Sequence, residues 1–144
     1  MLEASPNLRH LEVSYGFLRP LLDDESVCCL LKQRITHIYI LIPLTTTLES
    51  ILSSISQLTL TFSSLKHFYF GLGKGYQSAE SLILTILKYL CQWKSLVSFG
   101  VVNIVVAEEI VSKDIQQWVM ENSSLHEHTS FIVDFTNGIF RLWL

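Results

Sequence analysis

Histidine and tyrosine recur at equivalent places in the chain, and they are the side chains best suited to chemistry or to binding. Six positions form three matching pairs: His10 with Glu12, His37 with Tyr39, and His67 with Tyr69. Imidazoles are common zinc ligands, and aromatic side chains are enriched at binding surfaces. Zinc needs three or four ligands that converge, whereas equivalent positions on neighbouring parallel strands point the same way. The pattern therefore predicts a binding surface, with no metal site and no cofactor.

A second stretch with chemical potential is Gly71-Leu72-Gly73-Lys74-Gly75. A glycine-rich turn between a strand and a helix can hold phosphate with its backbone N–H groups. The phosphate-loop pattern needs a hydroxyl residue after the lysine, and Gly75 stands there; the dinucleotide pattern needs a glycine where Tyr76 stands. The favoured interpretation is a flexible connection with positive φ angles. The alternative function is a small-molecule or nucleotide-binding α/β domain that uses the Gly71–Gly75 turn.

The remaining candidates for chemistry have simpler interpretations. Asp23, Asp24 and Glu25 suit the first turn of a helix, where acidic side chains complement the helix dipole. The segment His126-Glu127-His128 lacks the H-E-x-x-H spacing of zinc proteases and falls in a predicted loop. No nucleophile elbow and no pair of catalytic acids is visible, so the chain is expected not to be an enzyme.

A short strand cassette must position the histidines and tyrosines. It consists of an apolar residue, two further residues, an apolar residue, any residue and an apolar residue. Its copies begin 27, 30, 31 and 32 residues apart. They are Leu8–Val13, Ile35–Ile40, Leu65–Phe70, Leu96–Val101 and a weaker copy from His128 to Val133. Such a spacing indicates one structural unit repeated as a stacked array.

Helical patterns fill the gaps between the first cassettes. Arg19-Pro20 is expected to open the first helix, since proline suits a first helical turn, and the acidic residues then follow in that turn. Pro43 ends the second strand. Thr46 and Glu49 have the spacing of a capping box ahead of a helix with one apolar stripe.

The second half of the chain follows the same rhythm and then breaks it. Ser78 is expected to cap the third helix, and Ser112 a last helix that ends near Asn122. The fourth cassette is unusually apolar, which predicts either a strand covered on both sides or one that continues into the connection after it. Asn137-Gly138 between two alternating segments is a strong hairpin signal. We expect this hairpin to close the last edge of a parallel sheet.

Side-by-side parallel strands should bring the outward side chains into ladders. The first predicted ladder is His10, His37, His67, Ser98 and Ser130. The second is Glu12, Tyr39, Tyr69, Gly100 and Ile132.

Composition narrows the class of protein. The chain has 144 residues, 49% of them apolar, and a net charge of −3 with scattered Lys and Arg, which argues against nucleic-acid binding. Cys28, Cys29 and Cys91 lie in helical patterns without metal spacing and are expected to be buried reduced thiols. Neither a signal peptide nor a membrane span is predicted. The expected location is intracellular, cytoplasmic or nuclear.

The first cassette begins at once after Ser5-Pro6-Asn7, and repeat arrays need a polar cap at each end. We therefore expect either a longer chain or a partner to cover the open side of the first strand.

Strand cassettes that alternate with helices at this spacing resemble the leucine-rich repeat family. That family places asparagine or cysteine three residues after the cassette, where this chain has Gly16, Pro43, Gly73 and Ile104. A flatter βα stack is therefore the alternative to a regular horseshoe. Long helical units, with Pro6-Asn7-Leu8 entering a strand, look like the carboxy-terminal repeats of F-box proteins.

The resemblance implies a fold, a function and partners. The fold class is α/β: stacked β-α repeats, with a mostly parallel sheet and helices on one side, closed by a carboxy-terminal β-hairpin. One domain, 1–144, would hold units at about 6–34, 35–64, 65–95 and 96–127 and a hairpin cap at 128–144. The implied function is non-enzymatic protein recognition through the sheet face, as the substrate-binding part of an F-box-type ubiquitin ligase receptor. Its scaffold would bind through an F-box segment, which this sequence does not contain.

Overall fold

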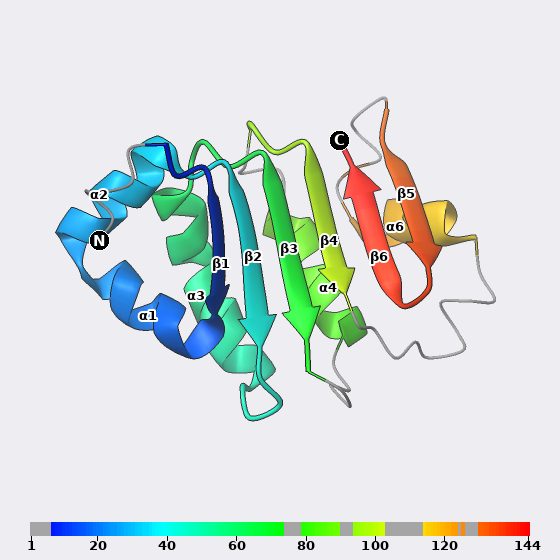
Figure 1. The fold of residues 1–144 in the computed structure, drawn as a ribbon. Coiled ribbons are helices and arrows are strands. Elements are labelled where there is room, and N and C mark those ends of the chain that lie inside the picture. Colours follow the sequence, from blue (N-terminus) through cyan, green and yellow to red (C-terminus); the bar gives the residue numbers. More distant parts are fainter. Residues whose placement is uncertain (1–6, 74–78, 90–93, 103–113, 124, 126–129) are drawn as a thin grey trace.

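A six-stranded sheet forms the front layer of the computed structural model (Figure 1). The structure describes residues 7–73, 79–89, 94–102, 114–123, 125 and 130–144. The strand order is β1-β2-β3-β4-β6-β5; β1 to β4 are parallel, and β6 runs antiparallel to both β4 and β5. The strands are β1 (His10–Ser14), β2 (His37–Ile42), β3 (His67–Leu72), β4 (Ser98–Val102), β5 (Ile132–Thr136) and β6 (Ile139–Trp143).

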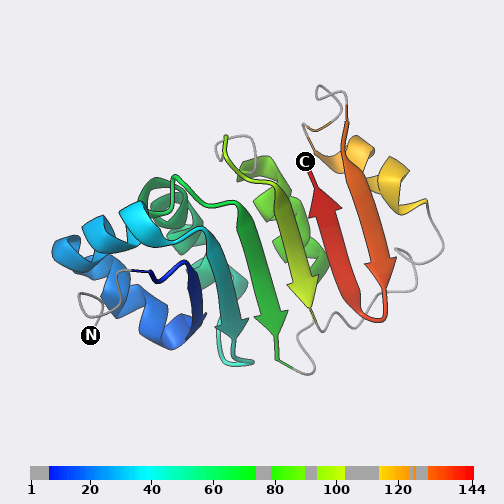
Figure 2. The ribbon, with the colours of Figure 1, turned by 45° about the horizontal axis from the view of Figure 1, so that its top comes forward.

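The described helices follow the strands; three of them lie behind the sheet and two lie beyond its β1 edge. The described helices are α1 (Tyr15–Asp23), α2 (Glu25–Arg34), α3 (Leu48–Thr61), α4 (Ala79–Tyr89) and α6 (Ile115–Asn122). Figures 1 and 2 show α3, α4 and α6 behind the strands and α1 and α2 beyond the β1 edge. The mixed α/β architecture, the mostly parallel sheet and the carboxy-terminal antiparallel hairpin confirm these parts of the predicted class. None of the described helices is long and apolar enough to span a bilayer.

Each of the four parallel strands begins at the third position of its cassette. The first position instead turns into the core at the strand entrance: Ile35, Leu65 and Leu96 are buried, and Leu8 is half-buried against the same cluster. Alternation then sends every second strand residue inward. The inward side chains of the four inner strands and the apolar stripes of the helices form one hydrophobic cluster, in which Phe68, Phe70, Phe99 and Phe140 are fully buried.

The first helical connection differs from the prediction. Its first helix begins at Tyr15, directly after β1, and Pro20 lies inside it instead of opening it. Proline in a helix interior lacks the N–H that would bond the preceding turn. Burial outweighs this cost, since Tyr15, Leu18 and Leu22 are all buried. The Tyr15 hydroxyl lies 2.7 Å from Ser54 Oγ.

The acidic cluster therefore occupies a helix junction. Asp24 caps the second helix, α2, and its carboxylate accepts from the N–H groups of Ser26 and Val27. The Ser26 hydroxyl also donates to this carboxylate, and it is the main cause that holds the pKa of Asp24 below its usual value. The two N–H groups add to this effect. All three acidic residues, Asp23, Asp24 and Glu25, are exposed.

The other helices confirm the predicted stripes but move two caps. Thr47, not Thr46, caps α3, and its side chain accepts from the Ser50 N–H. Asp114 caps α6 by accepting from Gln116 and Gln117, and Ser112 lies outside the described residues. Ser78 also lies outside them. The buried stripes are Ile51, Ile55 and Leu58 in α3, Leu82, Ile83, Ile86 and Leu87 in α4, and Trp118 and Val119 in α6.

The carboxy-terminal hairpin is confirmed. Asn137 and Gly138 have φ angles of 52° and 72°, as a two-residue hairpin turn requires. The second hairpin strand, β6, pairs with β4, which leaves β5 at the edge. At the other edge, no described strand pairs with the open side of β1.

Candidate binding face of the sheet

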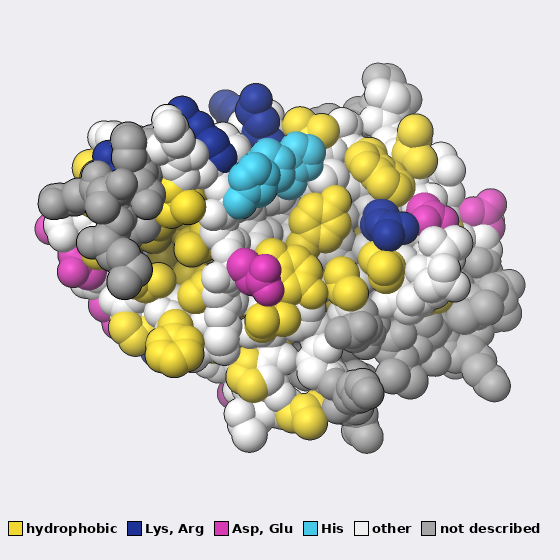
Figure 3. Space-filling view, viewed as in Figure 1, with side chains coloured by type: hydrophobic (Ala, Val, Ile, Leu, Met, Phe, Trp, Pro, Cys, Tyr) yellow, Lys and Arg dark blue, Asp and Glu magenta, His cyan; other side chains and the backbone are white. Residues whose placement is uncertain are grey.

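The face of the sheet opposite the helices carries all six predicted site residues. No described helix crosses this face, which Figures 1 and 3 show from the front. Strand register aligns its side chains in two rows across all six strands. The histidine row is His10, His37, His67, Ser98, Trp143 and Ile132. The tyrosine row is Glu12, Tyr39, Tyr69, Gly100, Arg141 and Asp134.

The rows confirm the predicted ladders over four strands and correct them beyond. Ser98 is opposite Trp143, not Ser130, and Gly100 is opposite Arg141, not Ile132. The reason is that the hairpin folds back, so its second strand meets β4. Ile132 instead pairs with Trp143 and thus belongs to the histidine row.

Three imidazoles stack along the first row, and we call His10, His37 and His67 the histidine stack. The ring centroids of His10 and His37 are 4.1 Å apart, and those of His37 and His67 are 4.2 Å apart with an interplanar angle of 25°. The separation follows from the spacing of parallel strands. In Figure 3 the stack forms one continuous group in the upper part of the face, over the first residues of β1, β2 and β3. Among the described residues, no group of three or more His, Cys, Asp or Glu side chains is placed to hold a metal ion.

His37 is the middle ring of the stack, and every charged group that shifts its pKa is positive when ionised. Partial burial is the main cause that lowers the pKa of His37, and charge repulsion from His67, His10 and Lys66 adds to it. The neutral form of His37 is therefore favoured. Protonation of the whole stack would place like charges at stacking distance.

Ser98 fixes two of the predicted side chains at once. Its Oγ lies 2.8 Å from His67 Nδ1 and 3.0 Å from Tyr69 Oη, and its side chain is buried at 2% exposure. A consistent arrangement has Tyr69 donating to Ser98 and Ser98 donating to His67. The His67 proton then sits on Nε2. Because the buried Ser98 hydroxyl is bonded to both rings, it positions His67 and Tyr69.

Two glycines make room for the two tyrosines. A Cβ at Gly100 would lie 2.5 Å from the Tyr69 ring atoms Cδ1 and Cε1, so the ring lies flat on the β4 backbone. A Cβ at Gly71 would collide with Tyr39, coming within 2.9 Å of Cζ. Each tyrosine is therefore half-buried across the next strand. Burial, together with the nearby negative charge of Glu12, raises the pKa of Tyr39.

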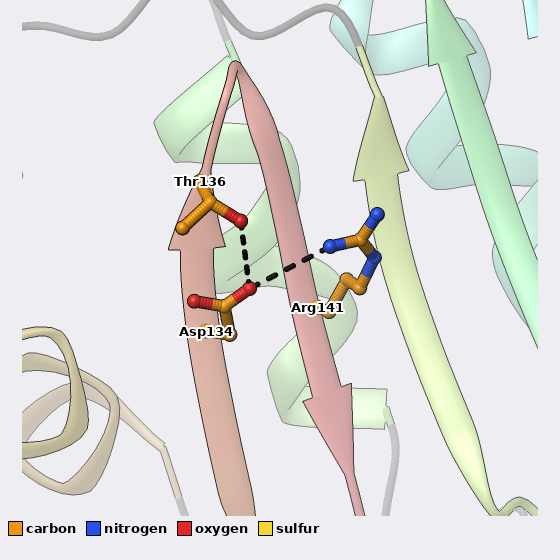
Figure 4. Close-up of polar contacts among 3 residues, drawn as sticks. All are labelled: Asp134, Thr136 and Arg141. Carbon is orange, nitrogen blue, oxygen red and sulfur yellow. Dashed lines mark hydrogen bonds and ion pairs between the residues drawn. The ribbon is translucent and has the colours of Figure 1, made fainter.

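The hairpin adds residues to the face that the sequence did not single out. Arg141 Nη1 lies 3.5 Å from Asp134 Oδ2, which also accepts a 2.9 Å hydrogen bond from the Thr136 hydroxyl (Figure 4). Trp143 extends the histidine row, and Ile132 beside it is 67% exposed. A signal did exist: the 139–144 segment is richer in apolar residues than 132–136, as expected for the inner strand of a hairpin.

The glycine-rich turn differs from its predicted form. Gly71 lies within β3, and Gly73 donates its N–H to the carbonyl of Ile42. Neither has a positive φ angle; among the described glycines only Gly138 does. Lys74 and Gly75 lie outside the described residues.

The other predicted features are settled only in part. Cys28 is half-buried and its thiol lies 3.2 Å from the Leu22 carbonyl, but Cys29 is exposed, so the prediction of buried thiols is wrong for Cys29. The α2 helix places Cys29 on its solvent side, since the core side is taken by Leu31. Cys91 and the segment 126–128 lie outside the described residues.

Comparisons with protein-family models, with curated proteins and with solved structures gave no match for this chain.

Proposed function

We propose that the chain is a non-enzymatic protein-recognition module that binds a segment of another protein on its exposed sheet face. The observation that carries the proposal is the preorganised pair of rows. Tyr39 and Tyr69 pack against glycines, Tyr69 is hydrogen-bonded to Ser98, and the histidines are stacked. Rings that are already fixed lose little conformational entropy on binding, and tyrosine, tryptophan and arginine dominate binding energy at interfaces.

The one serine–histidine contact on the face fits this role better than catalysis. Ser98 Oγ has His67 Nδ1 at hydrogen-bonding distance, but it is buried beneath the face and is also bonded to Tyr69. A nucleophile must reach its substrate, and its base needs a third group that orients it. A positioning role accounts for both contacts and for the burial of Ser98.

A more specific form of the proposal rests on the family resemblance. As the repeat part of an F-box-type ubiquitin ligase receptor, this face would hold the substrate. Binding to the ligase scaffold would be supplied by an F-box segment outside the present sequence. Fold-level analogy is the warrant for this form.

The alternative of a nucleotide or small-molecule site at the Gly71–Gly75 turn has less support. A phosphate cradle requires backbone N–H groups that are free to point at the ligand. The Gly73 N–H is used by Ile42, and Gly71 belongs to a sheet strand with Tyr39 packed against it.

The proposal is tested by comparing proteins captured by the wild-type chain and by variants. Tyr39→Ala combined with Tyr69→Ala removes both rings from the face. Leu60→Ser is the matched control, because Leu60 is 75% exposed on α3, in the layer behind the sheet. For a partner purified from the wild-type capture, we expect the double variant to weaken binding at least about tenfold, the effect typical of an interface hot spot. The control should bind normally.

Circular dichroism of each variant excludes unfolding as the cause. If the double variant and the control both retain every interaction, recognition through this face is wrong. If a Gly73→Val variant instead abolishes binding of a nucleotide that the wild type binds, the alternative site gains the evidence it lacks.

A further inference from the structure

Positive charge lies beside the histidine stack, at the end of the sheet where the parallel strands begin. Arg9, Lys66 and Lys94 are exposed in the connections that lead into β1, β3 and β4, and we call these three residues the basic rim. The described residues of the four connections, 7–9, 35–36, 62–66 and 94–97, contain no Asp or Glu. Figure 3 shows Lys and Arg side chains directly above the histidines.

The same topology places acidic residues at the other end of the sheet, where the parallel strands end. The helices return from the carboxyl ends of the strands, so their first turns lie there, and Glu49 and Glu80 occupy the first turns of α3 and α4. Acidic side chains are favoured at helix N-termini and basic ones at C-termini, where α2 carries Lys32 and Arg34. Among these described residues, positive charge therefore lies at the end of the sheet where the parallel strands begin, and negative charge where they end.

The stack presents hydrogen-bond donors to a partner. His67 is bonded within the chain through Nδ1, to Ser98, and His37 through Nδ1, to the Thr36 hydroxyl at 2.9 Å. That hydroxyl also donates to the Arg9 carbonyl at 3.5 Å. A protonated imidazole carries a proton on both of its nitrogens. Within the described residues Nε2 is then the nitrogen that remains for a partner, as a donor.

The charged groups around the stack leave its positive charge uncompensated when it protonates. His37 is faced by His10 from β1 and by His67 and Lys66 from the β3 side. Glu12 is the acidic residue of this part of the face. It lies one row away, and its charge acts on Tyr39. An anion placed against the stack would accept from the Nε2 donors and offset the repulsion among the rings.

We infer that the segment bound at this face is an acidic stretch of protein, with its carboxylates against the histidine stack and the basic rim and its apolar side chains on the tyrosine row. The inference rests on the proposed function. It adds the chemical class of the partner and a direction for its dependence on pH. Because imidazoles titrate near neutrality, mild acidification strengthens this binding.

A nucleic acid is the other polyanion to consider, and the charges favour a peptide. Phosphate backbones are bound by many Lys and Arg side chains along a basic face. The rim has three, the chain as a whole carries −3, and Glu12 and Asp134 stand in the tyrosine row of the same face. A mixed partner with carboxylates beside apolar residues matches this combination.

The test uses three probes with the full chain: a short peptide of alternating Glu and Tyr or Val, the same peptide with Gln for every Glu, and an oligothymidylate. Amide chemical shifts and calorimetry are recorded at about pH 7.5 and about pH 5.5, on either side of the imidazole range. We expect the acidic peptide to shift the amides of His10, His37 and His67 and to bind about three- to tenfold tighter at the lower pH, as for one charge-assisted contact. The Gln peptide should bind weakly at both.

Two sets of variants identify the groups responsible. Replacing all three histidines by Gln should remove the pH dependence, and Arg9→Ala with Lys66→Ala should weaken binding at both pH values. Arg19→Ala on α1 removes one positive charge, so it is the charge-matched control for Lys66→Ala alone, and it should bind as the wild type does. The lone variant Lys66→Ala covers the case in which the triple replacement fails to fold.

Each outcome bears on the inference. Equal affinity for the Glu and Gln peptides, no binding of the acidic peptide, or binding of the oligothymidylate in its place would overturn it. If the acidic peptide fails while the Tyr39 and Tyr69 double variant still loses its natural partner, only the acidic class is wrong and recognition by the face stands. If the peptide binds as expected while the double variant keeps all partners, the acidic site stands without the tyrosine row.

Discussion

The parallel part of the sheet and its hairpin place side chains side by side in opposite ways. In β1 to β3, equal cassette phase puts histidine beside histidine and tyrosine beside tyrosine. In β5 and β6 the antiparallel register puts unlike residues together, and Asp134 meets Arg141. Repetition thus gathers groups of one kind whose charges cannot compensate one another. The hairpin compensates its own charges.

This difference bears on where a partner is bound. A surface that already pairs its charges gains little from a partner, because each new contact must replace an existing one. The histidine stack has no such internal pairing, and its neighbours His10, His67 and Lys66 disfavour its own protonation. The parallel part is therefore where an external group adds most.

The strongest way to break the parallel part is to remove the space beneath Tyr69. Gly100→Ala places a methyl group 2.5 Å from the ring and 3.1 Å from the Phe140 carbonyl, so the ring must leave Ser98. We expect the free energy of unfolding to fall by about 1–3 kcal/mol, as for overpacking of a well-packed site. Denaturant titration measures the loss.

Gly16→Ala is the matched control for this change. Nothing lies within 4 Å of a Cβ at Gly16, which is in α1, and alanine favours helix. The same measurement should show no loss and a gain of up to about 1 kcal/mol. Equal destabilisation by both substitutions would mean that Tyr69 does not rest on β4.

Acidification should weaken the parallel part through His37. The pKa of His37 in the folded chain is below its ordinary value of 6.5, so the unfolded chain binds more protons as the pH falls through that value. The free energy of unfolding should therefore decrease between about pH 7.5 and about pH 5.5. In His37→Gln the decrease should be smaller, and denaturant titrations at both pH values measure the difference. If the free energy of unfolding decreased equally in the wild type and in His37→Gln, the histidine stack would not be the cause of the decrease.

The ion pair of the hairpin should have the smallest effect. Arg141 and Asp134 are 35% and 39% exposed, and exposed pairs contribute about 0.2–1 kcal/mol because water screens them. A double-mutant cycle with Asp134→Ala and Arg141→Ala should give a coupling energy in this range that decreases in high salt. A larger coupling energy that does not depend on salt would contradict the description of this ion pair as exposed and weak.

The sequence predicted the fold best where the same cassette is repeated along the chain. The cassettes predicted the four parallel strands, and they predicted that His10, His37, His67 and Ser98 share a row, because equal phase sets the register. The Asn137-Gly138 turn predicted the hairpin for a similarly local reason, its positive φ angles.

Features that depend on distant contacts were predicted poorly. A two-residue turn fixes how β5 pairs with β6, but not which of them meets β4; the apolar content of 139–144 was the one signal for β6, and Arg141 and Trp143 were missed. The first helix was placed at Pro20 by local preference, whereas burial of Tyr15 and Leu18 decides its start. The role of Ser98 depends on the rotamers of two neighbouring rings, which no local pattern encodes.

The register of β2 between its two parallel neighbours has a consequence for how such a chain could be lengthened. One copy of the unit from Ile35 to Ser64, inserted after itself, would add a strand whose inward and outward residues meet their own kind on both sides. Each insertion would extend the row by one imidazole and bring one more like charge to it on protonation. The reversed strand β6 cannot accept a unit of this kind beyond it. Growth by duplication is therefore open within the parallel strands and closed at the hairpin.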